Sequence, residues 1–116
     1  MHEVSLVQSL ICRVEREARR HGATGVHRVV VRIGAEGGVE PGLFRTAFES
    51  CRRGTVCDGA ELELLGEKVS WLCASCGAPI PAGRYLACPV CAWPARLAGG
   101  DALVLERVEL EVPDHV

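Results

Sequence analysis

Apolar side chains recur three and four residues apart over residues 3–21, which predicts an amphipathic helix. The apolar face of this helix is formed by Val4, Val7, Leu10, Ile11, Val14 and Ala18. Serine and arginine side chains occupy the opposite face. Gly22 follows the last turn, and glycine commonly ends a helix. The pattern therefore predicts that one face of residues 3–21 packs against a core.

A second helix is predicted from Pro41 to about Arg53. Proline suits the first helical position, because the N–H that it lacks would have no partner there. The buried face of this helix is expected to consist of Leu43, Phe44, Ala47, Phe48 and Cys51. Gly54 is expected to end it.

Residues 26–33 alternate with period two, as in a β-strand. One face of this strand is formed by Val29, Val31 and Ile33. Residues 60–65 and 68–72 also read as extended chain, and Gly66 between them predicts a bend or bulge. In residues 102–112 the apolar pattern changes phase between Leu105 and Val108, which predicts a β-bulge.

The stretch from residue 73 to residue 100 has a different character, because it is rich in cysteine, proline and glycine and shows no useful helical or strand period. We therefore predict an α+β fold: a small mixed β-sheet with two helices, plus an inserted zinc-ribbon-like module. The α+β domain is expected to comprise residues 1–72 and 101–116, and the module residues 73–100.

Four cysteines form two Cys-x-x-Cys pairs, Cys73 with Cys76 and Cys88 with Cys91. Four thiolates suit one tetrahedral zinc ion and leave no open position for a substrate, so we predict a structural zinc site. Gly77, directly after the first pair, permits the left-handed residue of such a turn. The alternative is a pair of disulfides or redox thiols, but neither pair opens a helix beside a βαβ pattern.

Composition narrows the class of protein. The net charge is -2, so the chain lacks the basic footprint of a nucleic-acid-binding protein. It has no apolar run near the ~18 residues of a membrane span and no secretory signal at its start. An odd count of seven cysteines is unlike a secreted disulfide framework. We therefore expect a cytoplasmic protein without a membrane or nucleic-acid partner.

The N-terminus offers a second metal site. A free terminal amine, a peptide nitrogen and the imidazole of His2 can chelate one metal in a planar arrangement, which suits Ni(II) or Cu(II) rather than zinc. The peptide nitrogens of His2 and Glu3 would have to lose protons, so binding should weaken as the pH falls. The alternative is that His2 belongs to a frayed, solvated end. We expect Met1 to remain, because the bulky His2 disfavours its removal.

The start Met1-His2-Glu3 and the two cysteine pairs, together with residues 5–10, 29–34, 43–49 and 59–63, resemble the HypA/HybF family of hydrogenase maturation proteins. The resemblance covers nearly the whole chain. It implies a nickel metallochaperone for [NiFe]-hydrogenase, and in some organisms for urease. Its implied partners are a HypB-type GTPase and the precursor of the hydrogenase large subunit.

The resemblance also implies which residues bind nickel: Met1, His2 and Glu3, with Glu40 as a further candidate. The alternative for Glu40, which we favour, is a carboxylate that stabilises a helix N-terminus. Some relatives carry a histidine beside each cysteine pair, whereas Gly77 and Ala92 stand there in this chain. An exchange of zinc ligands from thiolate to imidazole is therefore not expected.

The remaining candidates point to no enzyme, because no catalytic constellation or phosphate-binding loop is present. We expect Cys51 in the core, and we expect neither Cys12 nor Cys57 to be a nucleophile, because neither has a base nearby. Trp71 and Trp93 are expected to pack around the module or to dock a partner.

Two rival functions follow from the same residues. The first is a zinc-ribbon adaptor for nucleic acid or protein, but only Arg84 is basic between Cys73 and Cys91. The second is a thiol redox switch. The sequence leaves open whether the chain is a monomer or a weak homodimer.

Overall fold

The computed structural model describes residues 2–35, 37–81, 87–100 and 102–113. Its main sheet has the order β2-β1-β6, in which β1 is parallel to β2 and antiparallel to β6. The elements of this part are α1 (His2–Arg20), β1 (Gly25–Gly34), α2 (Pro41–Cys51), β2 (Glu61–Glu67) and β6 (Leu103–Glu111). The predicted α+β class with a small mixed sheet is therefore confirmed.

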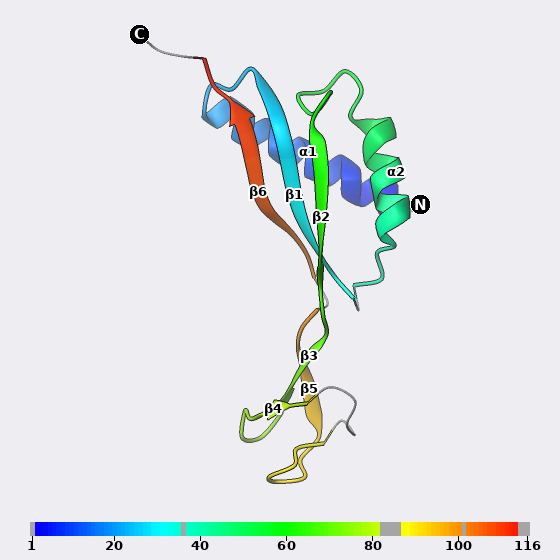
Figure 1. Ribbon diagram of the computed structural model, residues 1–116, viewed down its shortest axis with the longest axis vertical. Coiled ribbons are helices and arrows are strands. Elements are labelled where there is room, and N and C mark those ends of the chain that lie inside the picture. Colours follow the sequence, from blue (N-terminus) through cyan, green and yellow to red (C-terminus); the bar gives the residue numbers. More distant parts are fainter. Residues whose placement is uncertain (1, 36, 82–86, 101, 114–116) are drawn as a thin grey trace.

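The core lies between the helices and one face of this sheet (Figure 1). Helix α1 contributes its predicted apolar face, and α2 contributes two phenylalanines that are fully buried. The central members of the cluster are Val7, Val14, Val29, Val31, Phe44 and Phe48. Each large apolar side chain buried in this way stabilises the fold by about 2 kcal/mol.

The opposite face of the main sheet carries charges. Arg28 contacts glutamates of both neighbouring strands, Glu61 at 3.1 Å and Glu109 at 3.9 Å. Arg32 likewise pairs with Glu67 on β2 and with Glu106 on β6. These side chains are all partly exposed, from 28% for Glu106 to 74% for Glu61, so each pair adds little stability by itself. Together they mark this face as the one turned to solvent.

Two expected irregularities had different outcomes. The bulge in the last strand is confirmed: Val30 pairs with Arg107 and Val31 with Leu105, so Glu106 has no partner in the register. The predicted bend or bulge at Gly66 is wrong, because Gly66 pairs in register with Ile33 and β2 continues to Glu67. The neighbouring strand β1 holds this glycine in the ladder.

The chain then forms a second sheet, in the order β4-β3-β5, at one end of the molecule (Figure 1). Its strands are β3 (Ser70–Cys73), β4 (Pro79–Ile80) and β5 (Ala95–Gly99). Residues 73–100 therefore contain strands, although their sequence showed no useful strand period. Strands this short leave no readable period, and pairing with β3 forms them. The division into domains at residues 72/73 and 100/101 stays a prediction.

The two sheets meet where the chain crosses itself. Gly100 has a φ of +89°, and a Cβ built there would lie 2.7 Å from the Cα atom of Val69. Only glycine fits this crossing, because both the space and the backbone conformation exclude a side chain. No helix in the described part of the chain is long and apolar enough to cross a membrane.

Candidate metal centre

Four cysteine sulfurs converge in the second sheet. The Sγ atom of Cys73 lies 3.3 Å from that of Cys91, and the Sγ atom of Cys76 lies 3.7 Å from that of Cys88 and 4.0 Å from that of Cys91. All four lie within 4.8 Å of one another. The structure thus brings together the two pairs that the sequence singled out.

The two cysteine pairs sit in matching turns. The N–H of Gly77 donates to the carbonyl of Cys73 at 3.1 Å, and the N–H of Ala92 donates to the carbonyl of Cys88 at 2.9 Å. Both donors have left-handed backbones, with φ of +76° and +59°. The expected left-handed glycine is therefore confirmed. The second turn holds an alanine in a conformation that favours glycine.

Backbone N–H groups point at the first sulfur of each turn. Ser75 and Cys76 both donate to the Sγ atom of Cys73 at 3.3 Å, and Val90 donates to that of Cys88 at 3.4 Å. Such bonds stabilise a thiolate more than a thiol. The N–H groups of the two turns therefore stabilise the first cysteine of each pair as a thiolate, the form that binds a metal.

The pKa values of the first cysteine of each pair are lowered, and those of the second cysteine are raised. The backbone N–H of Cys76 is the main cause that lowers the pKa of Cys73, to about 6. The N–H of Cys91 lowers the pKa of Cys88. The N–H of Trp93 favours ionisation of Cys91, but neighbouring thiols and desolvation outweigh it and raise the pKa of Cys91 to about 12. Four sulfurs this close therefore hold their full negative charge only if a cation balances it.

This donor set fits zinc. Tetrahedral zinc with bonds of ~2.3 Å separates its sulfur ligands by about 3.8 Å, close to the spacing found here. Disulfide sulfurs would lie about 2.05 Å apart, so none of the seven cysteines is in a disulfide. Cys73 and Cys88 are buried, whereas Cys76 and Cys91 are exposed. Four sulfurs complete a closed structural site and leave no position for a substrate.

Of the candidate nickel ligands, Glu3 lies in the first turn of α1 and Glu40 at the start of α2. Helix α1 begins at His2, while Met1 and the side chain of His2 lie outside the described residues. The carboxylate of Glu3 accepts a hydrogen bond from the backbone N–H of Glu40, at 3.5 Å. Glu40 is the N-cap of α2, and its own carboxylate accepts from the N–H of Leu43 at 2.6 Å. Periodicity within each helix could not reveal this contact between their starts.

Comparison with known proteins shows the family of the chain. A family model described as "Hydrogenase/urease nickel incorporation, metallochaperone, hypA" matches residues 1–110. The hydrogenase maturation factor HypA of Methylocella silvestris is 38% identical over 116 residues, which cover 96% of this chain and 100% of that protein. The protein of the same name from Aquifex aeolicus is 40% identical, covering 97% and 99%. The chain belongs to the HypA family.

Solved HypA structures share the fold. The solution structure of the nickel metallochaperone HypA from Helicobacter pylori matches with a TM-score of 0.77 at 32% identity and covers 96% of this chain and 98% of that one. A second HypA solution structure matches with a TM-score of 0.83 at 32% identity, covering 97% and 98%. The predicted family and function are thus confirmed: this HypA-family chain is a nickel metallochaperone of hydrogenase maturation, with a cysteine cluster that fits structural zinc.

The other cysteines and tryptophans differ in their surroundings. Cys57 is fully buried although it lies in a turn, whereas Cys51 is only half-buried and Cys12 is exposed. Packing buries Cys57, and its local sequence gave no signal of this. Trp71 is half-buried in β3, and 56% of Trp93 is exposed. The expected packing around the module therefore holds for Trp71 only in part and fails for Trp93.

Proposed function

We propose that this protein binds one Ni(II) ion through Met1, His2 and Glu3 and passes it to the precursor of the [NiFe]-hydrogenase large subunit. The start of α1 at His2 carries this proposal. The first four N–H groups of a helix have no acceptor within it, so the amides of His2 and Glu3 can lose protons without breaking a helical hydrogen bond. Amine, amide and imidazole nitrogens together form a planar ligand set that suits Ni(II).

Transfer on this proposal is a ligand exchange without covalent chemistry on a substrate. Each amide nitrogen that regains its proton loses its bond to nickel, so the ion is released stepwise. We propose a HypB-type GTPase as a further partner and the cytoplasm as the place of action. There, reducing conditions keep the seven cysteines as thiols. Glu3 also holds the backbone of Glu40, which ties the nickel site to α2.

The zinc ligands on this proposal are Cys73, Cys76, Cys88 and Cys91. Zinc bound there supplies a fixed cross-link among four chain positions, and its binding free energy becomes folding free energy of the second sheet. The N–H groups of Ser75 and Val90 hold two of the ligands as thiolates. Zinc orients the module and takes no part in nickel exchange.

Nickel calorimetry on the untagged chain tests the function. We expect about one Ni(II) per chain in the wild type and none in His2→Ala, because the imidazole completes the nitrogen set. His21→Ala is the matched control, since His21 lies just past the other end of α1, where its imidazole lies 3.7 Å from the carboxylate of Glu17. Zinc content should be unchanged in all three proteins. Full nickel binding by His2→Ala would refute the proposal.

A further inference from the structure

Strand β2 is an edge strand, and α2 covers only the first part of its free edge (Figure 1). The guanidinium of Arg52 donates to the carbonyl of Ala60 at 2.7 Å, and that of Arg45 donates to the carbonyl of Leu62 at 3.0 Å. These two carbonyls point away from β1. Arg45 of α2 and Arg52, the C-cap residue of this helix, therefore satisfy the outward acceptors at the start of the strand.

The rest of the edge has no such cover. Alternate residues of a strand direct their backbone N–H and C=O groups to the same side. Because the carbonyl of Leu62 points outward, the backbone groups of Leu64 and Gly66 also point outward. The carbonyl of Glu67 faces inward, since it accepts from the N–H of Ala35 at 3.0 Å. Within the described part of the chain, no partner contacts the outward N–H and C=O groups of Leu64 and Gly66. An unpaired edge of this kind can accept another strand.

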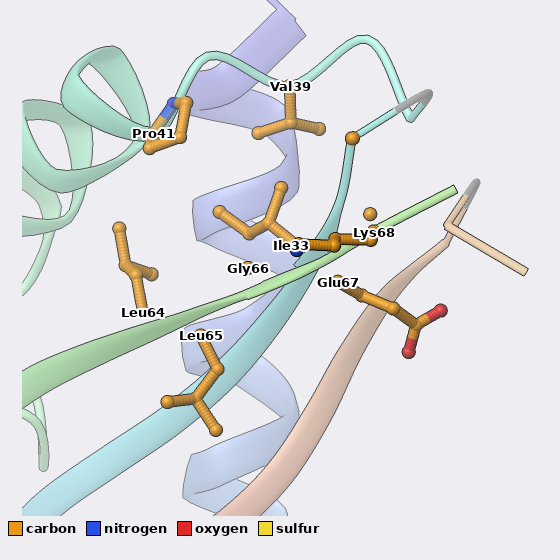
Figure 2. A pocket seen from close by; sticks show the side chains of 10 residues that line it. Ile33, Val39, Pro41, Leu64, Leu65, Gly66, Glu67 and Lys68 are labelled. Atoms are coloured by element: carbon orange, nitrogen blue, oxygen red, sulfur yellow. The ribbon is translucent and has the colours of Figure 1, made fainter. Parts of the chain in front are cut away.

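A groove of about 490 Å³ runs along this uncovered edge. Figure 2 shows Leu64, Ile33, Val39 and Pro41 around the hollow on one side of β2, with Leu65 on the other side. Gly66 lies in the groove wall, and a Cβ built there would have nothing within 4 Å. The absence of a side chain at this position therefore keeps the groove open without serving the packing of the fold.

Lys68 supplies the charge of the groove. The other charged residue of its lining, Glu67, is already engaged by Arg32 at 2.9 Å and by the N–H of Gly100 at 2.8 Å. Lys68 lines the same groove and makes no ion pair with the described residues. An occupant with a carboxylate would complement it.

We propose that this edge binds a short extended segment of the protein that receives nickel, apolar at alternate positions and carrying a carboxylate opposite Lys68. The segment would extend the sheet by pairing with the backbone of Leu64 and Gly66 and would insert apolar side chains into the groove. The bound segment must be short, because Arg45 and Arg52 already occupy the outward carbonyls at the start of the edge. The inference rests on the proposed function, because it assigns the segment to the nickel acceptor.

The position of the groove suits that role. Val39 and Pro41, which line it, flank Glu40 in the chain, and the backbone N–H of Glu40 contacts the carboxylate of Glu3. A peptide bound in the groove would lie beside the start of α1. Docking there would bring an acceptor close to the nickel ligands without covering them.

Overlapping synthetic peptides that span the hydrogenase large-subunit precursor test the proposal, with the full untagged chain and fluorescence anisotropy. We expect one acidic, apolar peptide to bind, and Gly66→Val to weaken it at least about tenfold by filling the groove. Gly25→Val is the matched control, because Gly25 also lies in the main sheet, at the far end of β1, with nothing within 4 Å of a built Cβ. Lys68→Glu should weaken binding several-fold, and a Lys in place of the peptide's carboxylate should restore it.

Hydrogen exchange with the bound peptide should protect the amides of Leu64 and Gly66. Absence of any binding peptide, equal binding by Gly66→Val and wild type, or protection at another surface would each overturn the proposal. So would a chain that dimerises through this edge, since the occupant would then be a second copy. Nickel binding by each variant is measured in parallel. Its retention separates a failed docking site from a failed nickel site.

Discussion

At the scale of single residues, the two cysteine turns differ at one position. Gly77 and Ala92 occupy the same place after each pair, and both have positive φ. An alanine in the left-handed region is strained by about 1 kcal/mol relative to glycine. The alanine brings no compensating contact to the metal site, because Gly77 and Ala92 donate the same N–H to carbonyl hydrogen bond in their turns.

We predict that Ala92→Gly stabilises the zinc module by about 0.5–1 kcal/mol, since relief of strain exceeds the entropy that glycine adds to the unfolded chain. The reverse change, Gly77→Ala, should destabilise it by about 1 kcal/mol, although a Cβ there would meet nothing within 4 Å. Resistance of zinc to a competing chelator measures both effects. Equal resistance of the two variants would contradict the argument.

Cys57 is the second residue whose surroundings set its chemistry. Burial is the main cause that raises its pKa to about 11, and the charge of Glu15 adds to it. The folded state therefore holds the thiol proton more tightly than the unfolded state does. The resulting contribution to stability is present below the ordinary pKa of 9.0 and is lost as the pH rises from there toward 11.

Alkylation checks this prediction. In the zinc-loaded protein at about pH 8, iodoacetamide should modify exposed Cys12 and leave Cys57 intact, because the reactive species is the thiolate. Peptide mapping by mass spectrometry distinguishes the two sites. Modification of Cys57 at the rate of Cys12 would show that the turn opens readily.

At the scale of elements, α2 both covers the core and holds the edge of β2. Phe44 and Phe48 face the core, while Arg45 and Arg52 donate to carbonyls of the strand. An edge strand with a free row of acceptors risks pairing with other chains. The helix therefore protects part of the edge as it packs.

We expect Arg52→Ala to lower the free energy of unfolding by about 1 kcal/mol, because the carbonyl of Ala60 loses a charged donor at 2.7 Å. Arg53→Ala is the control, since its side chain makes no hydrogen bond or ion pair among the described residues. Urea denaturation compares the two. A loss as large in Arg53→Ala would mean that the bond to Ala60 is not responsible.

At the scale of the whole molecule, the two sheets form an elongated body whose longest extent is 60 Å. The sheets are joined by the links from β2 to β3 and from β5 to β6 (Figure 1). The core residues of the main sheet come from the helices and from β1, β2 and β6. The described residues of the second sheet add no member to this core, so we expect this sheet to depend on its four sulfurs.

Removal of zinc should therefore affect the two sheets unequally. We predict that Cys76→Ser, or a strong chelator, abolishes protection from hydrogen exchange in β3–β5 while β1 and the buried face of α1 stay protected. Acidification should release zinc in the same way, since protons compete for the thiolates as the pH falls. Collapse of both sheets together would show that zinc supports the entire fold.

Features that depend on neighbouring residues could be predicted from the sequence alone. Helical spacing over α1, alternation along β1 and the paired cysteine turns are local patterns, and the phase change at Glu106 is a local count of residues. Each follows from backbone periods that one segment displays alone. The family resemblance rested on such motifs.

Contacts between distant segments became visible only in the folded molecule. It placed β1 between β2 and β6, joined Glu3 to the backbone of Glu40, buried Cys57 and left Leu64 and Gly66 uncovered at the edge of the sheet. It also kept Gly66 inside a strand where a bend was expected. These outcomes depend on how packed elements divide space and hydrogen bonds among them, and no single segment of sequence carries that information.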